Sequence, residues 1–296
     1  MGLNENDPVA QPEISALEQG LRDSGWHAGA GIRIEYRWGA ADAARVHKQI
    51  EDLVGLKSEV IISRSTPITT VVAREVKTVP VVFVQVSDPV GDGIVASLAH
   101  PGANVTGFTN IEASLAAKWV ELLKQLAPIT DVAFLYSPKT SPGRRGTYFR
   151  GPFESAAASL GVHAVVAPAD SDSEIENAFA ASRKAKRGAV IVAPGVFLVS
   201  RRELIIGLAA RHRLPAIYPF TFWANLGGLM SYGSDSTDIF RRAASYVDRI
   251  LKGANASDLP IQAPVKFELV INRNAAKIAG IALPQSLLLR ADRTID

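Results

Sequence analysis

The chain has 296 residues, a formal net charge of +3 and a hydrophobic content of 47%, and it contains no cysteine. This length and apolar content suit two α/β lobes of ordinary domain size. The absence of cysteine excludes disulfides, thiolate catalysis and thiolate metal sites. No run of about 18 apolar residues is present, which excludes a membrane-spanning helix.

The basic residues come in short groups such as Lys184 with Lys186-Arg187, and Arg201-Arg202. Groups of this kind usually lie on solvated helix faces, and no aromatic residues are interleaved with them as in a nucleic-acid groove. We therefore expect no nucleic-acid partner.

Helices and strands alternate along the first third of the chain. In order, the pattern predicts a helix over 9–24, a strand over 32–38, a helix over 43–57, a strand over 59–63, a helix over 67–77 and a strand over 79–86. Repeated βα units are typical of a parallel, doubly wound sheet. Only Met1-Gly2-Leu3 precedes the first helix, although a lobe of this kind normally begins with a strand.

A second α/β series follows Pro128. It predicts strands over 132–136, 163–166, 189–192 and 215–218, separated by helices over 153–160, 173–185 and 200–211. A helix over 237–252 and an apolar segment over 265–271 are too short for a third domain, so we expect them to return to the first and then the second lobe. The predicted lobes are 1–106 with 233–262, and 107–232 with 263–296, joined by three crossings.

The segment 79–109 reads VPVVFVQVSDPVGDGIVASLAHPGANVTGFT. Its apolar strand ends at Ser87-Asp88-Pro89, and the carboxyl ends of buried parallel strands form the ligand crevice of open α/β sheets. A short helix is expected from Gly91, and residues 104–109 are expected to form the first crossing. Asp88 could act as a general base, although an acidic residue that fixes a turn beside proline is the commoner case.

The same segment also allows a nucleotide-dependent enzyme. Gly91-Asp92-Gly93 begins a G-x-G-x-x-A pattern, with Glu112 about 20 residues further on. The pattern follows a late strand and Glu112 does not end an apolar strand, so this alternative is the weaker one.

A second strand end lies at Ser63-Arg64-Ser65-Thr66-Pro67. Thr66 is predicted to be the N-cap of the next helix, with Pro67 in its first turn. Free N–H groups and the hydroxyls of Ser65 and Thr66 would suit a ligand carboxylate. The alternative is that Thr66 only caps its own helix.

Four aromatic residues lie within Tyr218-Pro219-Phe220-Thr221-Phe222-Trp223, followed by Asn225 and two glycines. Each ring alone could belong to a core. Together with Phe197, the cluster is more typical of one wall of a pocket.

No catalytic group emerges from the sequence. The five histidines lack the spacing of metal ligands, and no G-x-S-x-G motif is present. We therefore expect neither an enzyme nor a cofactor or metal site.

With these motifs in order, the chain resembles the periplasmic substrate-binding proteins of ABC transporters, in the TrpX-like group that includes tryptophan- and tyrosine-binding proteins. The resemblance rests on GLRDSGW, IRIEYRWGAAD, the segment 79–109, GGLMSYGSD and the tail FELVINRNAAKIAGIALPQSLLLRAD. It implies a type I periplasmic-binding-protein fold with a three-crossing hinge. Family members carry a signal peptide and a strand upstream, so we expect either a first strand reduced to a stub or a Met1 that is an internal methionine of a longer precursor.

The resemblance implies ligand contacts from loops that follow the strands of both lobes. The implied residues are Asn4, Ser65, Thr66, Ser87, Asp88, Ser137, Gly195, Phe197, Tyr218, Phe220, Trp223 and Asn225.

The chain departs from the family pattern at two of these loops. Ala193-Pro194-Gly195 stands where relatives often carry an acidic or amide residue, and SPKTSPGRRG stands where asparagine is common. Without a carboxylate for a ligand ammonium, an aromatic or apolar carboxylate becomes as plausible as an aromatic amino acid. Its anionic group could then pair with Arg64, Lys139 or Arg144.

The favoured function is the solute-binding component of an ABC importer, periplasmic and monomeric, which delivers a small organic ligand to a membrane permease. The alternative is a ligand-sensing module of the same fold in a receptor or regulator.

Overall fold

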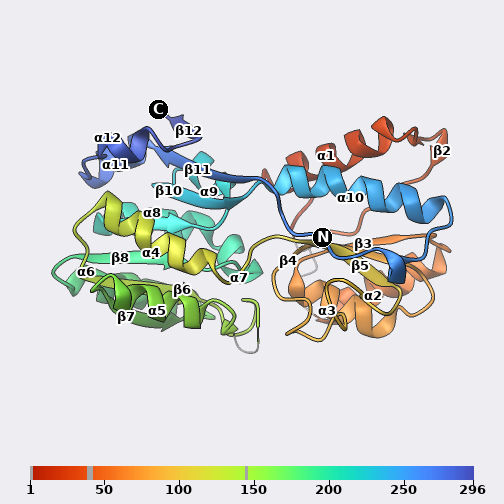
Figure 1. Cartoon of the computed structure of the whole chain (residues 1–296), viewed down its shortest axis with the longest axis horizontal. Coiled ribbons are helices and arrows are strands. Elements are labelled where there is room, and N and C mark those ends of the chain that lie inside the picture. The colour runs from red at the N-terminus through yellow and green to blue at the C-terminus, as the bar shows by residue number, and fades with distance from the viewer. Residues whose placement is uncertain (1–2, 39–42, 144–145) are drawn as a thin grey trace. The chain divides into compact units, whose positions relative to one another are not determined.

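The computed structural model describes residues 3–38, 43–143 and 146–296 and divides into two compact units. Unit 1 comprises 1–111 and 236–265, and unit 2 comprises 112–235 and 266–296. The α/β fold predicted from the sequence is confirmed, and Figure 1 shows the elements of both units. No helix among the described residues is long and apolar enough to cross a membrane.

The described part of unit 1 is built on a parallel sheet in the order β3-β4-β5. Its elements are α1 (Ala10–Asp23), β1 (His27–Ala28), β2 (Gly31–Ile32), α2 (Ala43–Gly55), β3 (Ile61–Arg64), α3 (Thr66–Glu75), β4 (Val81–Val86), β5 (Val105–Thr109), α10 (Ser236–Leu251) and the 3-10 turn η2 (Ala256–Asp258).

Alternate residues of β4 face opposite layers of helices. Val82 and Val84 pack into one apolar cluster with α1 and α10, whereas Val81 and Phe83 pack into another with α2 and α3. The run therefore reads as continuously apolar, because both faces of a central parallel strand are covered. In Figure 1, α10 lies along α1 although the two are far apart in sequence.

The described part of unit 2 has a larger sheet in the order β12-β11-β10-β9-β8-β6-β7. Its elements are α4 (Leu115–Leu126), β6 (Asp131–Tyr136), α5 (Arg150–Ser159), β7 (His163–Pro168), α6 (Asp172–Lys184), β8 (Gly188–Val192), α7 (Val196–Ser200), α8 (Arg202–His212), β9 (Ala216–Tyr218), α9 (Thr221–Asn225), β10 (Met230–Ser234), β11 (Phe267–Asn272), α11 (Arg273–Ala279), α12 (Gln285–Leu288) and β12 (Arg293–Ile295).

The sheet of unit 2 is mixed and not purely parallel. β11 runs antiparallel to β10, with Met230 opposite Ile271, because the chain returns from unit 1 in the opposite direction. Gly233 of β10 lies so close to the neighbouring loop that an added Cβ would be 1.8 Å from the backbone oxygen of Pro219.

Three expectations about the elements need correction. The strand predicted over 32–38 is absent, since only Gly31–Ile32 pairs there, with His27–Ala28. The helix predicted over 200–211 is α8, which begins at Arg202, because Ser200 instead ends a separate short helix, α7, that was not predicted.

The third correction concerns residues 104–109, which were expected to cross between lobes. Residues 105–109 instead form β5, which pairs along β4 from Val81↔Val105 to Val84↔Phe108. The chain therefore leaves unit 1 after Ile111. The other two connections follow Asp235 and Val265, a few residues beyond the expected 232 and 262, because β10 stays in unit 2 and Gln262 bonds to β5 in unit 1.

Candidate functional site

Unit 1 carries two buried polar side chains at the carboxyl ends of neighbouring strands. Ser65 follows β3 and Gln85 lies near the end of β4, and the Ser65 N–H donates to the Val84 carbonyl at 3.0 Å. The Ser65 hydroxyl and the Gln85 Nε2 amide have no hydrogen-bond partner among the described residues. Buried groups of this type are nearly always bonded, so both are available to a ligand.

The backbone at both residues has a positive φ, of +77° at Ser65 and +60° at Gln85. Such sparsely populated conformations cost a side-chain-bearing residue about 1–3 kcal/mol. At Gln85 the cause is a bulge in β4, since Val84 pairs with Phe108 and Val86 pairs with Thr109. Strain of this kind concentrates at functional sites, where a side chain must be aimed.

Asn110 forms hydrogen bonds to two residues at the end of β4. Its Nδ2 donates to Gln85 Oε1 at 3.2 Å, and its Oδ1 accepts from the Ser87 hydroxyl at 2.8 Å. The Ser87 hydroxyl hydrogen is therefore already used within unit 1. Sequence reasoning missed Gln85 and Asn110, because a continuously apolar strand gives no sign of a bulge.

The remaining predicted residues of unit 1 differ in their placement. Ser65, and not Thr66, occupies the N-cap position of α3, and its hydroxyl makes no capping bond; Thr66 is half-buried. Asp88 Oδ1 accepts from the Gly91 N–H at 2.9 Å, which is the turn-fixing role. Asn4 is exposed, and its carbonyl accepts from the Asp7 N–H.

The short helix predicted from Gly91 is absent. Residues 89–93 form turns, with Gly93 at a φ of +70°, and the Ile94 and Val95 N–H groups are both bonded to the Pro89 carbonyl. The G-x-G-x-x-A pattern therefore has no helix N-terminus to receive a phosphate, which removes the structural basis of the nucleotide alternative.

Arg64 has an internal counter-ion. Its guanidinium makes two hydrogen bonds to the Glu13 carboxylate of α1, at 2.8 and 3.1 Å, and both side chains are buried. A ligand carboxylate would have to compete with Glu13 for this cation. Arg144, another predicted partner, lies outside the described residues.

Unit 2 places Ser137 at the centre of a polar network beyond β6. The Ser137 hydroxyl donates to Asp170 Oδ1 at 2.6 Å and accepts from the Thr140 N–H and hydroxyl at 3.1 and 2.9 Å. Asp170 follows β7, and Oδ1 also accepts from the Lys139 N–H at 3.4 Å. Asp170 Oδ2 has no bond to any described residue. Sequence reasoning missed Asp170, because only strand pairing places the β7 end beside the β6 end.

Gly195 and Phe197 adjoin this network through Thr140. The Thr140 hydroxyl accepts from the Phe197 N–H at 3.2 Å, and an added Cβ at Gly195 would lie 2.9 Å from Ser141 Oγ. The backbone at Gly195 is extended, so close approach is the reason that glycine fits there. The Phe197 ring is partly exposed and lies 5.3 Å from the Arg201 guanidinium carbon.

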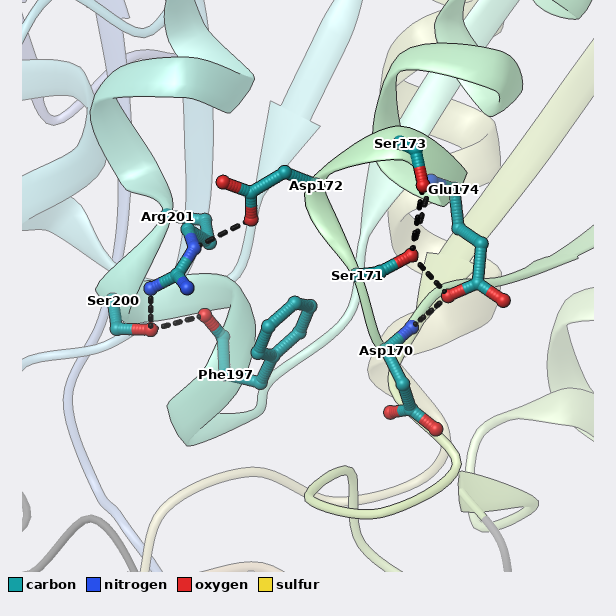
Figure 2. Close-up of polar contacts among 8 residues, drawn as sticks. All are labelled: Asp170, Ser171, Asp172, Ser173, Glu174, Phe197, Ser200 and Arg201. Atoms are coloured by element: carbon teal, nitrogen blue, oxygen red, sulfur yellow. Dashed lines mark hydrogen bonds and ion pairs between the residues drawn. The ribbon is translucent and has the colours of Figure 1, made fainter.

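Acidic side chains line the start of α6. Figure 2 shows Arg201 reaching Asp172, with a distance of 2.6 Å, and Glu174 turning back to the Asp170 N–H at 2.8 Å. The hydrogen bond from the Asp170 backbone, assisted by the Ser171 hydroxyl, lowers the pKa of Glu174. Among the described residues, no group of His, Cys, Asp or Glu side chains is arranged to hold a metal ion.

The aromatic segment Tyr218 to Trp223 is largely buried. Tyr218 and Trp223 are fully buried and stack on each other with ring centroids 4.9 Å apart, whereas Phe220 is 7% exposed and stacks on the half-buried Phe222. This favours the core alternative for Tyr218 and Trp223. Burial raises the pKa of Tyr218, whose hydroxyl has no partner among the described residues. Asn225 is exposed.

The chain is similar to several known proteins. A solved structure of a conserved domain protein from Vibrio cholerae is 27% identical with a TM-score of 0.89, covering 99% of this chain and 97% of that one. An ABC domain from Streptococcus pneumonia in complex with L-Trp is 24% identical with a TM-score of 0.82, covering 96% of each chain. A tyrosine-binding protein of Clostridioides difficile is 24% identical over 274 residues, which is 91% of this chain and 78% of that protein.

The fold of these structures is that of the type I periplasmic-binding proteins, as predicted. The model of the family described as ABC transporter substrate binding protein matches residues 6–295, so the chain belongs to that family.

Proposed function

We propose that this protein is the solute-binding component of an ABC importer and that its ligand is an aromatic amino acid. Membership of the substrate-binding family supports the first part, and the relatives named for tyrosine and L-Trp support the second. The observation that carries the proposal is the pair of unpartnered buried groups, Ser65 Oγ and Gln85 Nε2, at adjacent strand ends.

Ser65 and Gln85 are suited to the ligand carboxylate. The Gln85 Nε2 amide and the Ser65 hydroxyl are donors, and the first turn of α3 adds the positive end of a helix dipole. Neutral donors can hold an anion without a paired cation. That agrees with Arg64 being neutralised by Glu13.

Asp170 is suited to the ligand ammonium. The loop after β8 reads Ala193-Pro194-Gly195 and has no acidic side chain, but Asp170 supplies a carboxylate after β7. Its Oδ1 is fixed by Ser137 and the Lys139 N–H, which leaves Oδ2 for a charge-assisted bond. Asp170 therefore supports an aromatic amino acid over the apolar carboxylate that the sequence left as plausible, because it offers a partner for the ammonium group.

In this proposal both units bind one ligand, and a hinge motion closes them because the closed state has the higher affinity for it. No bond is made or broken. The closed, ligand-bound form is recognised by a membrane permease, and the protein acts as a periplasmic monomer.

A thermal-shift and calorimetric screen tests the ligand class. L-Tyr, L-Trp and L-Phe should stabilise the protein by about 2.7 kcal/mol at 100 times their dissociation constants. Ser65→Gly and Gln85→Gly remove the two polar groups while suiting the positive φ, and each should weaken binding about tenfold, or 1.4 kcal/mol. Lys57→Gly, at a φ of +58° on exposed backbone, is the matched control. If none of the three aromatic amino acids stabilises the protein, the proposed ligand class is refuted.

The ammonium site is tested with tyrosine and its analogue without the amino group, 3-(4-hydroxyphenyl)propionate. The protein should prefer tyrosine, and Asp170→Asn should abolish that preference by weakening tyrosine alone. Asp172→Asn, which removes the partner of Arg201, should leave the preference intact. If the protein binds both compounds equally, Asp170 has no such role, although the carboxylate site stands.

Cell uptake separates the importer from a sensor. Uptake of labelled tyrosine should require both this protein and a permease, and it should fail in cells that carry Gln85→Gly. Uptake unchanged by deletion of the protein would favour the sensing role.

A further inference from the structure

Two basic segments far apart in sequence meet in unit 2. Residues 183–187 form the end of α6 and the turn into β8, and residues 211–213 form the end of α8. Together with residues 127–129 they line a cavity of about 300 Å³ that is open to solvent. The basic residues that line it are Arg183, Lys186, Arg187, His212 and Arg213.

No carboxylate lines this cavity, and none of its five basic side chains has an ion-pair partner among the described residues. Asp131, on the adjoining strand, is occupied elsewhere: its carboxylate accepts from the Thr130 hydroxyl at 2.7 Å and pairs with His163 at 3.2 Å. The cavity therefore concentrates positive charge that the fold does not neutralise.

Helix stability explains only part of this charge. Basic residues in the last turn interact favourably with the helix dipole, which accounts for Arg183 and His212. Lys186 and Arg187 lie beyond the end of α6. Arg213 has a left-handed backbone, with a φ of +51°, where glycine would be more comfortable. Helix stability therefore does not account for Lys186, Arg187 and Arg213, whereas a role in binding an anion in the cavity would account for them.

The cavity lies at the opposite edge of the sheet from Ser137 and Gly195. Arg187 immediately precedes β8, and two residues separate Arg213 from β9, so the cavity adjoins the amino ends of these strands. Ser137 and Gly195 follow the carboxyl ends of β6 and β8. The cavity is therefore separate from the polar network proposed to receive the amino acid.

We propose that this cavity, the basic cavity, binds a polyvalent anion that carries phosphate groups. Guanidinium groups form paired, charge-assisted hydrogen bonds to phosphate oxygens, and a lysine and a histidine add further donors. A volume of about 300 Å³ accommodates a diphosphate or a phosphate headgroup but not a folded nucleic acid. The phosphate can come from a soluble compound or from an anionic lipid.

The test uses the full chain and two probes. Pyrophosphate is titrated by calorimetry at an ionic strength of about 20 mM, where charge screening is weak. Vesicles of phosphatidylglycerol in phosphatidylcholine are tested by cosedimentation, with pure phosphatidylcholine as reference. The variant is Arg187→Ala with Arg213→Gly, because glycine suits the left-handed backbone at position 213 and the fold should survive. The control, Lys48→Ala with Lys277→Ala, removes two exposed charges elsewhere.

We expect the protein and the control to bind one of the two probes and the variant to bind it at least about tenfold more weakly. Binding of pyrophosphate alone identifies a soluble anion, and binding of anionic vesicles alone identifies a lipid headgroup. The proposal is wrong if neither probe binds, or if the variant and the control lose the same affinity, because binding would then follow net charge alone.

Discussion

The buried ion pair between Glu13 and Arg64 gives the sharpest test of the packing in unit 1. It joins α1 to the end of β3 with a shortest distance of 2.8 Å, and the two side chains are 1% and 8% exposed. The perturbations are Glu13→Leu, Arg64→Met and the two combined. The single changes leave one buried charge without a partner, whereas the combination leaves none.

The expected magnitudes follow from two opposing terms. At 2.8 Å and an effective dielectric constant of about 20, the attraction between the charges is about 6 kcal/mol. Burying each charge costs several kcal/mol, so the pair as a whole contributes little net stability. Removing one partner leaves the other penalty uncompensated and should cost about 3–5 kcal/mol, whereas the double replacement should lie within about 1 kcal/mol of the original protein.

Hydrogen exchange read on peptides from α1 and β3 measures this effect in unit 1 alone, which matters because two units need not unfold in one step. The reasoning fails if the double variant is as unstable as the sum of the single ones. Calorimetry on the double variant adds a functional check: tyrosine binding should persist, since Glu13 and not the ligand is the partner of Arg64. Loss of binding with unit 1 intact would assign Arg64 to the ligand.

Four further substitutions test other parts of the structure. Gly233→Ala should destabilise unit 2 by about 2–3 kcal/mol through the clash with the neighbouring loop, whereas Gly207→Ala, in open space on α8, should stabilise it by about 0.5–1 kcal/mol; urea unfolding compares them. Tyr218→Phe removes a buried hydroxyl without a described partner and should be neutral or stabilising by about 1 kcal/mol in the same assay, so a clear loss would mean that the hydroxyl is bonded. The hydrogen bond from Lys252 lowers the pKa of Asp248 in the folded protein. The ionised Asp248 carboxylate therefore stabilises the fold above its unfolded pKa of about 3.9, and this stabilisation is lost as the pH falls through its folded pKa. Asp248→Asn should reduce the loss of unfolding free energy that is measured as the pH is lowered. An unchanged pH dependence of stability in the acid range would contradict the prediction.

Most elements could be predicted from periodicity alone. The apolar run of β4 and the amphipathic pattern of α10 are local properties, and the structure places β4 and α10 within two residues of the predicted ends. The prediction was wrong where a local pattern had no partner strand, as over 32–38, or where strand pairing overrode the expected role, as at β5. Gly91 was misassigned because a glycine pattern does not reveal that Asp88 and Pro89 already close a turn there.

The features of the candidate site also divide into those set by the local sequence and those set by tertiary contacts. The sequence by itself determined the order of α/β elements and the strand ends at which polar residues gather, because the spacing of apolar residues along the chain fixes both. The tertiary structure decided which of those residues have partners. The bulge that strains Gln85, the Glu13 carboxylate that neutralises Arg64, the Asp170 carboxylate beside Ser137 and the basic cavity all depend on contacts between distant segments. A local pattern cannot encode such contacts, since they arise only when strands pair and helices pack.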